Sequence, residues 1–404
     1  MEKVLMRLAL IIDDYLPHST RVGAKMFHEL ACHYVSLGHD VTVITPAEGQ
    51  IDKLVKHKID NVNVWYFSSG AIKDVPKITR AINETLLSLR AWRAISAEVK
   101  PDTFDGIIYY SPSIFFGWLV SKIKTRCQCK AYLVLRDLFP QWVIDAGMVS
   151  SGSVIEKYFR FFEKYSYGQA DMIGLMSEKN LQLFNRVTQS QYSVEILRNW
   201  AELKPHFLTS NDESVRKRLN LEDKVIFFYG GNIGHAQDMA NLMRLARAMS
   251  GYDRAHFLFV GQGDEVELIN QLAQKWQLDN FTYLPSVNQA EFKNILADID
   301  IGLFSLSAQH TAHNFPGKLL GYMVQSLPIL GSVNQGNDLQ EIMNSSQAGM
   351  ISVNGEDQLL FDNALALYQD DELRKQIGKN AFLLLENEFS VQSASSLILE
   401  EIKG

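Results

Sequence analysis

The residues best suited to chemistry in this sequence lie in a polar loop that leads into a helix. In chain order they are His313, Asn314, Phe315, Pro316, Gly317 and Lys318. Backbone N–H groups at the start of a helix, with one lysine beside them, can hold a diphosphate without a metal ion. The loop therefore indicates a nucleotide-linked ligand near residues 313–322. The alternative is an ordinary strand-to-helix turn with a surface lysine.

Two glycine-rich turns in the same half of the chain offer further close approaches to a ligand. Their residues are Gly231, Asn232 and Gly234 in the first turn, and Gly261 and Gly263 in the second. Both turns follow strongly apolar runs, and glycine lets the backbone come close to a phosphate or a flat base. Neither has the G-x-G-x-x-G spacing of a dinucleotide fingerprint. Tight turns and packing glycines are the competing interpretations.

Polar residues also follow two apolar runs in the first half of the chain. They are Ser19, Thr20 and Arg21 after residues 8–12, and Arg136 and Asp137 after residues 131–135. Ligands of open α/β sheets bind at the carboxyl ends of the strands. We expect these residues to contact a diphosphate or an acceptor, with Asp137 orienting or deprotonating an acceptor hydroxyl. A solvated loop and an ion pair that closes the strand end are the alternatives.

No metal site is expected from the sequence. Asp298 and Asp300 form a D-x-D pair, but they adjoin a buried strand and are interpreted as structural residues. His310 and His313 share a loop without a third nearby ligand. No other His/Cys group has the spacing of a zinc site.

These candidate residues are positioned by an alternation of strands and helices. The apolar runs 8–12 and 41–45 flank a helical pattern, and a long helix is predicted over residues 75–99. A second series of such units begins with the strand at residues 224–229. Continuous apolar strands between amphipathic helices are typical of parallel sheets covered on both faces. The sequence thus predicts two Rossmann-like domains, joined near residues 199–210, with the ligand in a cleft between them.

The composition is that of a soluble globular protein rather than a disordered one. Hydrophobic residues make up 47% and charged residues 21% of the 404 residues, and this length favours two or three domains. The net charge of −7 argues against non-specific nucleic-acid binding as the main role. Three cysteines without the usual CxxC spacing favour a reducing, cytosolic compartment. No apolar run is long enough to predict a transmembrane helix.

Basic and aromatic residues gather in one predicted helix. They are Lys157, Tyr158, Phe159, Arg160, Phe161, Phe162 and Lys164. This combination suits peripheral docking to an anionic membrane face. A solvated helix face above core aromatics is the alternative.

Taken together, segments in a fixed order resemble the family 4 retaining glycosyltransferases of the GT-B fold. The segments are Gly23–Leu30, Leu37–Val43, Arg136–Pro140, Arg198–Trp200, Gly231–Gly234, Val260–Gly263 and Asn314–Leu319. The chain is similar in particular to the WbuB-type bacterial transferases, which move N-acetyl-L-fucosamine onto lipid-linked O-antigen or capsule precursors. The resemblance covers nearly the whole chain.

The resemblance implies an acceptor-binding domain over residues 1–198 and a nucleotide-sugar domain over residues 199–379, facing across a cleft. A last helix, within residues 380–404, would cross back onto the first domain. The expected catalytic residues are Asp137, His313 and Lys318. The expected donor contacts are Gly23, Gly231, Asn232, Gly234, Gly261, Gly263, Asn314, Phe315, Pro316 and Lys318. The expected acceptor contacts are Ser19, Thr20, Arg21 and Arg136.

The implied reaction is a retaining, metal-independent transfer of N-acetyl-L-fucosamine from its UDP donor to an undecaprenyl-diphosphate-linked sugar. It needs no cofactor and takes place at the cytoplasmic face of the bacterial inner membrane. Lys318 and helix N-termini would neutralise the leaving diphosphate, which would help to take the acceptor proton. The chain departs from the family at two positions, because His313 and Gly321 stand where the family has glutamates. Gly321 leaves the ribose contact unexplained.

Two other functions remain open at this point. The first is a UDP-N-acetylhexosamine epimerase of the same fold, which would need no lipid acceptor. The second is a non-catalytic GT-B partner protein that activates another transferase.

Overall fold

The computed structural model divides the chain into two compact units. Unit 1 comprises Met1–Asn199 with Val391–Gly404, and unit 2 comprises Trp200–Ser390. The structure describes residues 5–17, 19, 21–71, 75–111, 113–145, 147–210, 212–309 and 315–403. Each unit is an α/β fold with its own sheet, so the predicted fold class of two Rossmann-like domains is confirmed.

Unit 1 is built on an eight-stranded sheet in the order β3-β4-β2-β1-β5-β6-β7-β8. The strands are β1 (Arg7–Ile11), β2 (Asp40–Glu48), β3 (Leu54–Ile59), β4 (Val62–Ser69), β5 (Gly106–Ser111), β6 (Lys130–Leu135), β7 (Met172–Leu175) and β8 (Val194–Ile196). Only the β3–β4 pair in this sheet is antiparallel. Since β1 is buried along almost its whole length, helices cover both faces of the sheet there.

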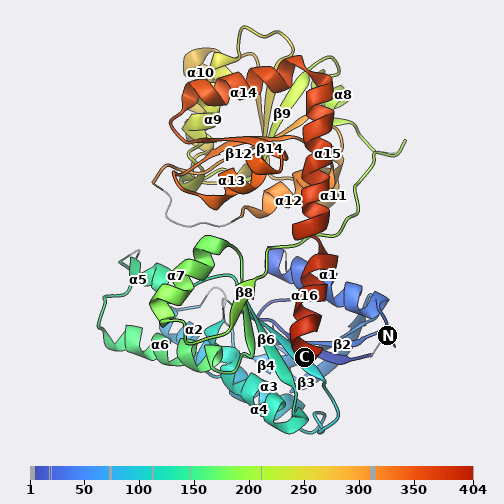
Figure 1. Cartoon of the computed structure of the whole chain (residues 1–404), viewed down its shortest axis with the longest axis vertical. Coiled ribbons are helices and arrows are strands. Elements are labelled where there is room, and N and C mark those ends of the chain that lie inside the picture. Colours follow the sequence, from blue (N-terminus) through green and yellow to red (C-terminus); the bar gives the residue numbers. More distant parts are fainter. Residues whose placement is uncertain are drawn as a thin grey trace. The chain divides into compact units, whose positions relative to one another are not determined.

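The helices of unit 1 include one from the C-terminal end of the chain. They are α1 (Val22–Ser36), α2 (Lys77–Thr85), α3 (Leu87–Ile95), α4 (Gly117–Cys127), α5 (Gln141–Asp145), α6 (Val154–Tyr167), α7 (Glu178–Thr188) and α16 (Val391–Lys403). Helix α16 lies beside α1 (Figure 1), where the Tyr34 hydroxyl donates to the Ser395 carbonyl at 3.4 Å. A side chain at Gly106 would collide with Ile402, so the small residue lets α16 pack against β5. None of the helices in the described ranges is long and apolar enough to cross a membrane.

Unit 2 is built on a six-stranded parallel sheet in the order β11-β10-β9-β12-β13-β14. The strands are β9 (Val225–Asn232), β10 (Ala255–Gln262), β11 (Phe281–Pro285), β12 (Ile301–Ser305), β13 (Ile329–Val333) and β14 (Gly349–Val353). The helices are α8 (Val215–Leu219), α9 (Met239–Ala248), α10 (Val266–Trp276), α11 (Gln289–Leu296), α12 (Gly317–Val324), α13 (Asp338–Ser345), α14 (Asp357–Gln369) and α15 (Asp371–Glu388). Separate apolar clusters fill the two faces of this sheet.

Two predicted boundaries differ from the structure. The helix predicted over residues 75–99 is two helices, α2 and α3, which meet at Leu86. Thr85 donates its hydroxyl to the Ala81 carbonyl at 2.6 Å, a back-bond that bends helices. The chain passes from unit 2 to unit 1 at residues 390–391, not at residue 380. Helix α15 stays with unit 2 because Ala381 and Leu385 are buried in its core.

Candidate functional site

The sheet of unit 2 reverses its strand order beside its first strand, β9. Strands β10 and β11 extend to one side of β9, and β12, β13 and β14 extend to the other. Loops that leave the carboxyl ends of β9 and β12 diverge there, and such a switch point is where open α/β sheets bind ligands. The two loops contact each other, since the Ser307 N–H donates to the Ala236 carbonyl at 2.9 Å.

Lys318 lies at this switch point, in the first turn of α12. Its Nζ is 3.6 Å from the centroid of the Tyr229 ring, near the end of β9. A Cβ added to Gly231 would stand 3.6 Å from the same Nζ, so the glycine turn and the lysine are neighbours. The side chain is half-buried, and burial lowers the pKa of Lys318 to about 7. A lysine with this pKa is only partly charged near neutral pH, and an anion bound beside it favours the charged form.

The helix end reinforces the positive character of this site. Helix α12 begins at Gly317 after Pro316, whose φ of −63° suits the start of a helix. The first N–H groups of a helix have no partner within the helix, and the macrodipole adds partial positive charge there. Lys318, the α12 terminus and the backbone at Gly231 therefore form a cradle suited to a diphosphate.

Glycine is required in both predicted turns for the backbones to meet. A side chain at Gly261 would collide with the Gly231 carbonyl, and one at Gly263 would collide with the Ile233 carbonyl. Gly231 and Gly263 also have φ of +119° and +154°, values that other residues rarely adopt. The packing interpretation therefore accounts for Gly261 and Gly263. Gly231 is the glycine of the three that borders the lysine.

Hydrogen bonds of polar side chains fix the shape of the first glycine turn. The exposed Asn232 donates from Nδ2 to Gln237 Oε1 at 2.9 Å. Gly234 is buried, and a Cβ there would lie 2.9 Å from Asp264 Oδ1. Asp264 in turn accepts the His235 N–H at 3.3 Å. Asn232 and Gly234 are thus close to the cradle and shape its rim.

Tyr322 ties the two site-forming strands together and was not identified from the sequence. Its buried hydroxyl accepts the Gly230 N–H at 3.2 Å and donates to the Leu303 carbonyl at 3.1 Å. Tyr229, beneath Lys318, was also missed. Both are aromatic residues close in sequence to recognised motifs, and this proximity could have identified them as candidates.

The structure changes one predicted donor contact, that of Phe315, and does not describe His313 and Asn314. The Phe315 side chain is buried in the core of unit 2, with its ring centroid 4.3 Å from that of Phe389. It therefore anchors the loop, and only its backbone remains available to a donor. His313 and Asn314 lie outside the described residues.

Unit 1 has a second polar centre at its own switch point, between β1 and β5. Tyr110, near the carboxyl end of β5, is in contact range of Gly23, where an added Cβ would stand 2.8 Å from the hydroxyl. Burial raises the pKa of Tyr110 to about 12. The charges that act on it belong to Arg136, Asp13, Asp137 and Arg21. The loops after β1, β5 and β6 therefore converge on a residue that sequence reasoning missed.

The predicted acceptor residues after β1 are engaged with two aspartates. Arg21 Nε lies 3.5 Å from Asp14 Oδ2, and Ser19 Oγ donates to the same oxygen at 2.5 Å. Desolvation raises the pKa of the neighbouring Asp13, against the opposing effect of Arg21. The Arg21 side chain stays largely exposed, so a ligand can still reach it. Thr20 lies outside the described residues.

Arg136 and Asp137 differ in their exposure. Arg136 is buried, donates to the Arg198 carbonyl at 3.1 Å, and has its pKa lowered to about 10 by burial. Asp137 is exposed as a residue, yet the protein atoms around its carboxyl partly desolvate that group and raise its pKa. Arg136 thus holds the strand ends together, and Asp137 is the accessible member of the pair.

Two further polar groups in unit 2 are structural. Asp298 accepts from Ser214 Oγ at 2.7 Å, and Asp300 accepts the Ile226 N–H at 2.7 Å, which confirms the structural interpretation of the D-x-D pair.

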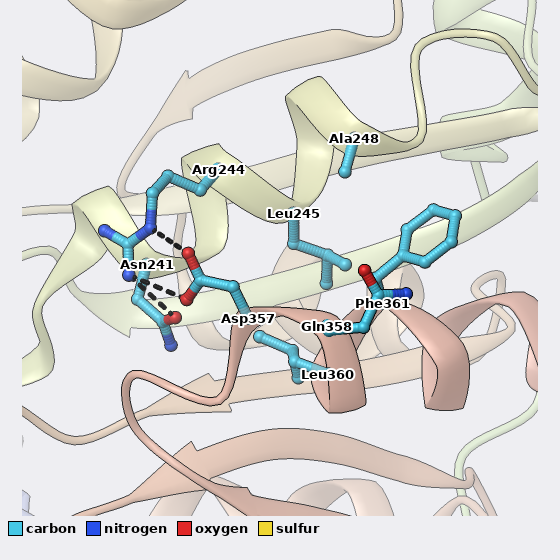
Figure 2. Close-up of a pocket in the computed structure, with 8 residues that line it drawn as sticks. All are labelled: Asn241, Arg244, Leu245, Ala248, Asp357, Gln358, Leu360 and Phe361. Carbon is cyan, nitrogen blue, oxygen red and sulfur yellow. Dashed lines mark hydrogen bonds and ion pairs between the residues drawn. The ribbon is translucent and has the colours of Figure 1, made fainter.

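A hollow of about 350 Å³ between α9 and α14 contains the Arg244–Asp357 pair (Figure 2). Arg244 Nε donates to Asp357 Oδ2 at 2.7 Å, and this hydrogen bond raises the pKa of Arg244. Its charged groups satisfy each other, so the hollow belongs to helix packing.

The sequence of unit 2 matches a known protein family. Residues 210–383 match the family described as glycosyl transferases group 1. The chain is 23% identical over 221 residues to the probable glycosyltransferase WbjE of Pseudomonas aeruginosa. This alignment covers 54% of this chain and 55% of WbjE. The chain is 22% identical over 291 residues to the putative colanic acid biosynthesis glycosyl transferase WcaI of Escherichia coli, 67% of this chain and 70% of WcaI. The first alignment therefore spans only about half of that relative.

Among solved structures, the fold is similar to that of Anabaena HepE in complex with UDP and glucose. The TM-score is 0.67 at 13% identity, over 98% of this chain and 99% of HepE. At this identity the similarity establishes the two-unit fold alone.

Proposed function

We propose that this chain, whose residues 210–383 form a glycosyl transferase domain of group 1, is an enzyme that transfers a sugar from a UDP-sugar to a lipid-linked acceptor. The observation that carries the proposal is Lys318, held against Tyr229 and Gly231 at the N-terminus of α12. Its cation and the helix end provide the charge that a leaving diphosphate requires.

The donor diphosphate binds in the cradle between the loops after β9 and β12. Anabaena HepE, which has the same fold, holds UDP and glucose, and this supports a uridine nucleotide here. Lys318 neutralises the charge that develops on the leaving diphosphate, so no divalent metal is needed for this step. The bond between the anomeric carbon and the phosphate oxygen breaks, and the departing oxygen helps to take the acceptor proton. The acceptor oxygen therefore bonds to the anomeric carbon on the face that the diphosphate leaves, and the configuration is retained.

The acceptor hydroxyl is received by the polar centre of unit 1. Asp137 is exposed and has a raised pKa, which suits a group that exchanges a proton with an acceptor. Arg21 provides an accessible cation for an acceptor diphosphate. Gly23 lets the first turn of α1 approach Tyr110 closely.

The acceptor is an undecaprenyl-diphosphate-linked sugar of O-antigen or capsule synthesis. The name of WcaI places that relative in synthesis of a bacterial polysaccharide, colanic acid. The donor sugar is N-acetyl-L-fucosamine, an assignment that rests on the resemblance to WbuB-type transferases.

Peripheral contact with an anionic membrane would bring the lipid acceptor to unit 1. Helix α6 exposes 63% of Phe161 and 82% of Val154. An apolar hollow of about 320 Å³, lined among others by Phe161, Phe115 and Trp118, adjoins this helix. Lys157 and Lys164 on α6 supply positive charge. Exposed aromatic and basic groups together favour the interface of an anionic bilayer.

A donor panel tests the proposed reaction. The purified chain is incubated with UDP-, GDP- and dTDP-sugars and a synthetic lipid-diphosphate sugar acceptor, and the products are identified by mass spectrometry. We expect an acceptor extended by one sugar from a UDP donor only. Reaction with GDP- or dTDP-sugars alone would overturn the donor assignment. Isomerised donor without acceptor would identify an epimerase, and an unchanged mixture would favour a non-catalytic partner.

Vesicle sedimentation tests the membrane contact. With vesicles rich in phosphatidylglycerol, Phe161→Glu should lower the bound fraction, because a charge replaces the exposed ring. Leu359→Glu, an equally drastic change at an exposed residue of α14, is the matched control and should bind as the parent does. Equal loss in both variants, or no binding by the parent, would refute docking through α6.

A further inference from the structure

Three side chains of unit 1 that suit a metal ion converge away from the polar centre around Tyr110. They are His28 and Cys32 of α1 and Asp60 of the turn between β3 and β4. His28 Nε2 lies 3.0 Å from Asp60 Oδ2 and 3.5 Å from Cys32 Sγ. The three ligand atoms all lie within 4.8 Å of one another. Thiolate, imidazole and carboxylate together are ligands that Zn²⁺ accepts.

The fold explains why sequence spacing did not reveal this group. His28 and Cys32 are four residues apart, so they share one face of α1. Asp60 comes from a hairpin turn in which Asp60 and Asn61 have φ of +47° and +66°. The antiparallel β3–β4 pair fixes that turn, since Ile59 is opposite Val62. The β3 strand was not predicted, and without it Asp60 had no reason to lie near α1.

The other two groups both approach the same ring nitrogen of His28, which argues for a metal rather than a catalytic dyad. Asp60 and Cys32 both approach Nε2 of His28, which has either one proton or one lone pair to share. A nucleophilic cysteine relay would need the acid and the thiol on opposite ring nitrogens. Here Nδ1 is 2.8 Å from the Tyr15 hydroxyl instead.

Tyr15 has the position of an outer-shell partner. Histidine that binds a metal through one nitrogen commonly donates the N–H of the other to an oxygen, which fixes the tautomer. The buried Tyr15 hydroxyl takes that role at Nδ1 and leaves the Nε2 lone pair directed toward Cys32 and Asp60. The Tyr15 ring also packs edge-on to the imidazole, with centroids 5.7 Å apart.

Two of the three separations are close to those of a tetrahedral zinc site, and the third, between sulfur and oxygen, is within 4.8 Å. Zinc–sulfur bonds of about 2.3 Å and zinc–nitrogen or –oxygen bonds of about 2.0–2.2 Å give ligand-to-ligand edges of about 3.3–3.6 Å. The sulfur–nitrogen separation of 3.5 Å falls in this range, and the nitrogen–oxygen separation of 3.0 Å needs to open only slightly. Asp60 can adjust, because its side chain is 72% exposed.

We propose that His28, Cys32 and Asp60 bind one Zn²⁺ ion, with water in the fourth position. The ion joins α1 to the β3–β4 turn. Through the His28–Tyr15 hydrogen bond it also positions the loop after β1, which carries Asp13 and Asp14. The ion crosslinks these segments of unit 1, and the proposal is independent of the transfer reaction assigned above.

Cobalt substitution gives a direct readout that does not depend on activity. The full chain is stripped with a chelator, dialysed and titrated with Co²⁺. We expect one equivalent to bind, with a sulfur-to-cobalt charge-transfer band in the near ultraviolet and visible bands typical of four-coordination. Zinc should displace the cobalt stoichiometrically, and elemental analysis should find one bound ion.

Matched variants identify the ligands. Cys32→Ser should abolish the charge-transfer band, whereas Cys127→Ser, at a buried cysteine of the same unit, should retain it. His28→Gln should remove tight binding, and His33→Gln on the same helix should not. Tyr15→Phe should weaken zinc binding by about 10- to 100-fold, the usual effect of losing an outer-shell partner.

Two outcomes would overturn the proposal. The first is absence of stoichiometric binding by the parent protein, which would leave a hydrogen-bonded Tyr15–His28–Asp60 network. The second is binding that survives both Cys32→Ser and His28→Gln, which would place the ion elsewhere. A metal-free chain that still transfers sugar leaves the proposed function intact, so the two proposals fail separately.

Discussion

Replacing Lys318 by methionine should weaken UDP binding and remove its pH dependence. Methionine keeps most of the side-chain volume over the Tyr229 ring but has no charge. Burial lowers the pKa of Lys318 to about 7 in the unliganded protein. A bound diphosphate stabilises the charged amine and therefore draws a proton onto it.

The magnitude follows from this pKa. An amine with a pKa of about 7 is half charged at pH 7 and about 1% charged at pH 9. If only the charged form binds, UDP affinity falls about 50-fold over this range. At pH 8, about 0.9 proton should be taken up for each UDP bound. Because a hydrogen bond to a charged group contributes about 1.5–3 kcal/mol, Lys318→Met should cost about 10- to 150-fold in affinity where the parent lysine is charged.

Isothermal titration calorimetry measures both effects. The dissociation constant is followed with pH, and the proton number comes from buffers of different ionisation enthalpy. Lys275→Met, at an exposed lysine of α10 in the same unit, is the matched control and should behave as the parent. The titration of the nucleotide itself contributes equally to the parent and to Lys318→Met, so it cancels in the difference between them.

Equal pH dependence in the parent and in Lys318→Met would contradict this prediction, because the titrating group would then lie elsewhere. So would unchanged affinity in the variant. A fall in affinity without proton uptake in the parent would mean that Lys318 is already charged before UDP binds.

Three other changes have defined outcomes. Tyr322→Phe should lower the free energy of unfolding by about 1–3 kcal/mol in urea titrations, because the Gly230 N–H of β9 loses a buried acceptor. Gly261→Ala should abolish UDP binding in calorimetry, since its Cβ would collide with the Gly231 carbonyl and displace the turn; retained binding would show that the turn can move. Hydrogen bonds from Arg7 lower the pKa of Asp105 from 3.8, so its carboxylate stabilises the fold above that pH and the effect disappears as pH falls through the folded pKa. Asp105→Asn should therefore lower the urea midpoint at neutral pH and less so in acid; an equal loss at both would contradict this.

The sheet-forming runs were predictable because they are continuous and apolar. Residues 8–12 and 224–229 correspond to β1 and β9, which are buried on both faces. Strand β3 was not predicted, since it is an edge strand with three consecutive polar residues, Lys56, His57 and Lys58, and gains its structure by pairing with β4. The break at Leu86 was also invisible, because the apolar period continues through it.

The site was predictable to the level of loops but not of contacts. The glycine turns were recognised because they follow apolar runs, and Lys318 because it lies at the start of a predicted helix; the topology brings them to one switch point. That Phe315 points into the core depends on Phe389, which is distant in sequence. Tyr110 became a site candidate only when the loops after β1, β5 and β6 were seen to converge on it.

Hydrogen–deuterium exchange of the full chain with and without UDP tests whether the donor diphosphate binds between the loops after β9 and β12. We predict slower exchange in peptides that span residues 230–238 and 315–324, and its loss in Lys318→Met. Protection confined to the loops after β1 and β6, or no change at α12 at saturating UDP, would contradict the claim.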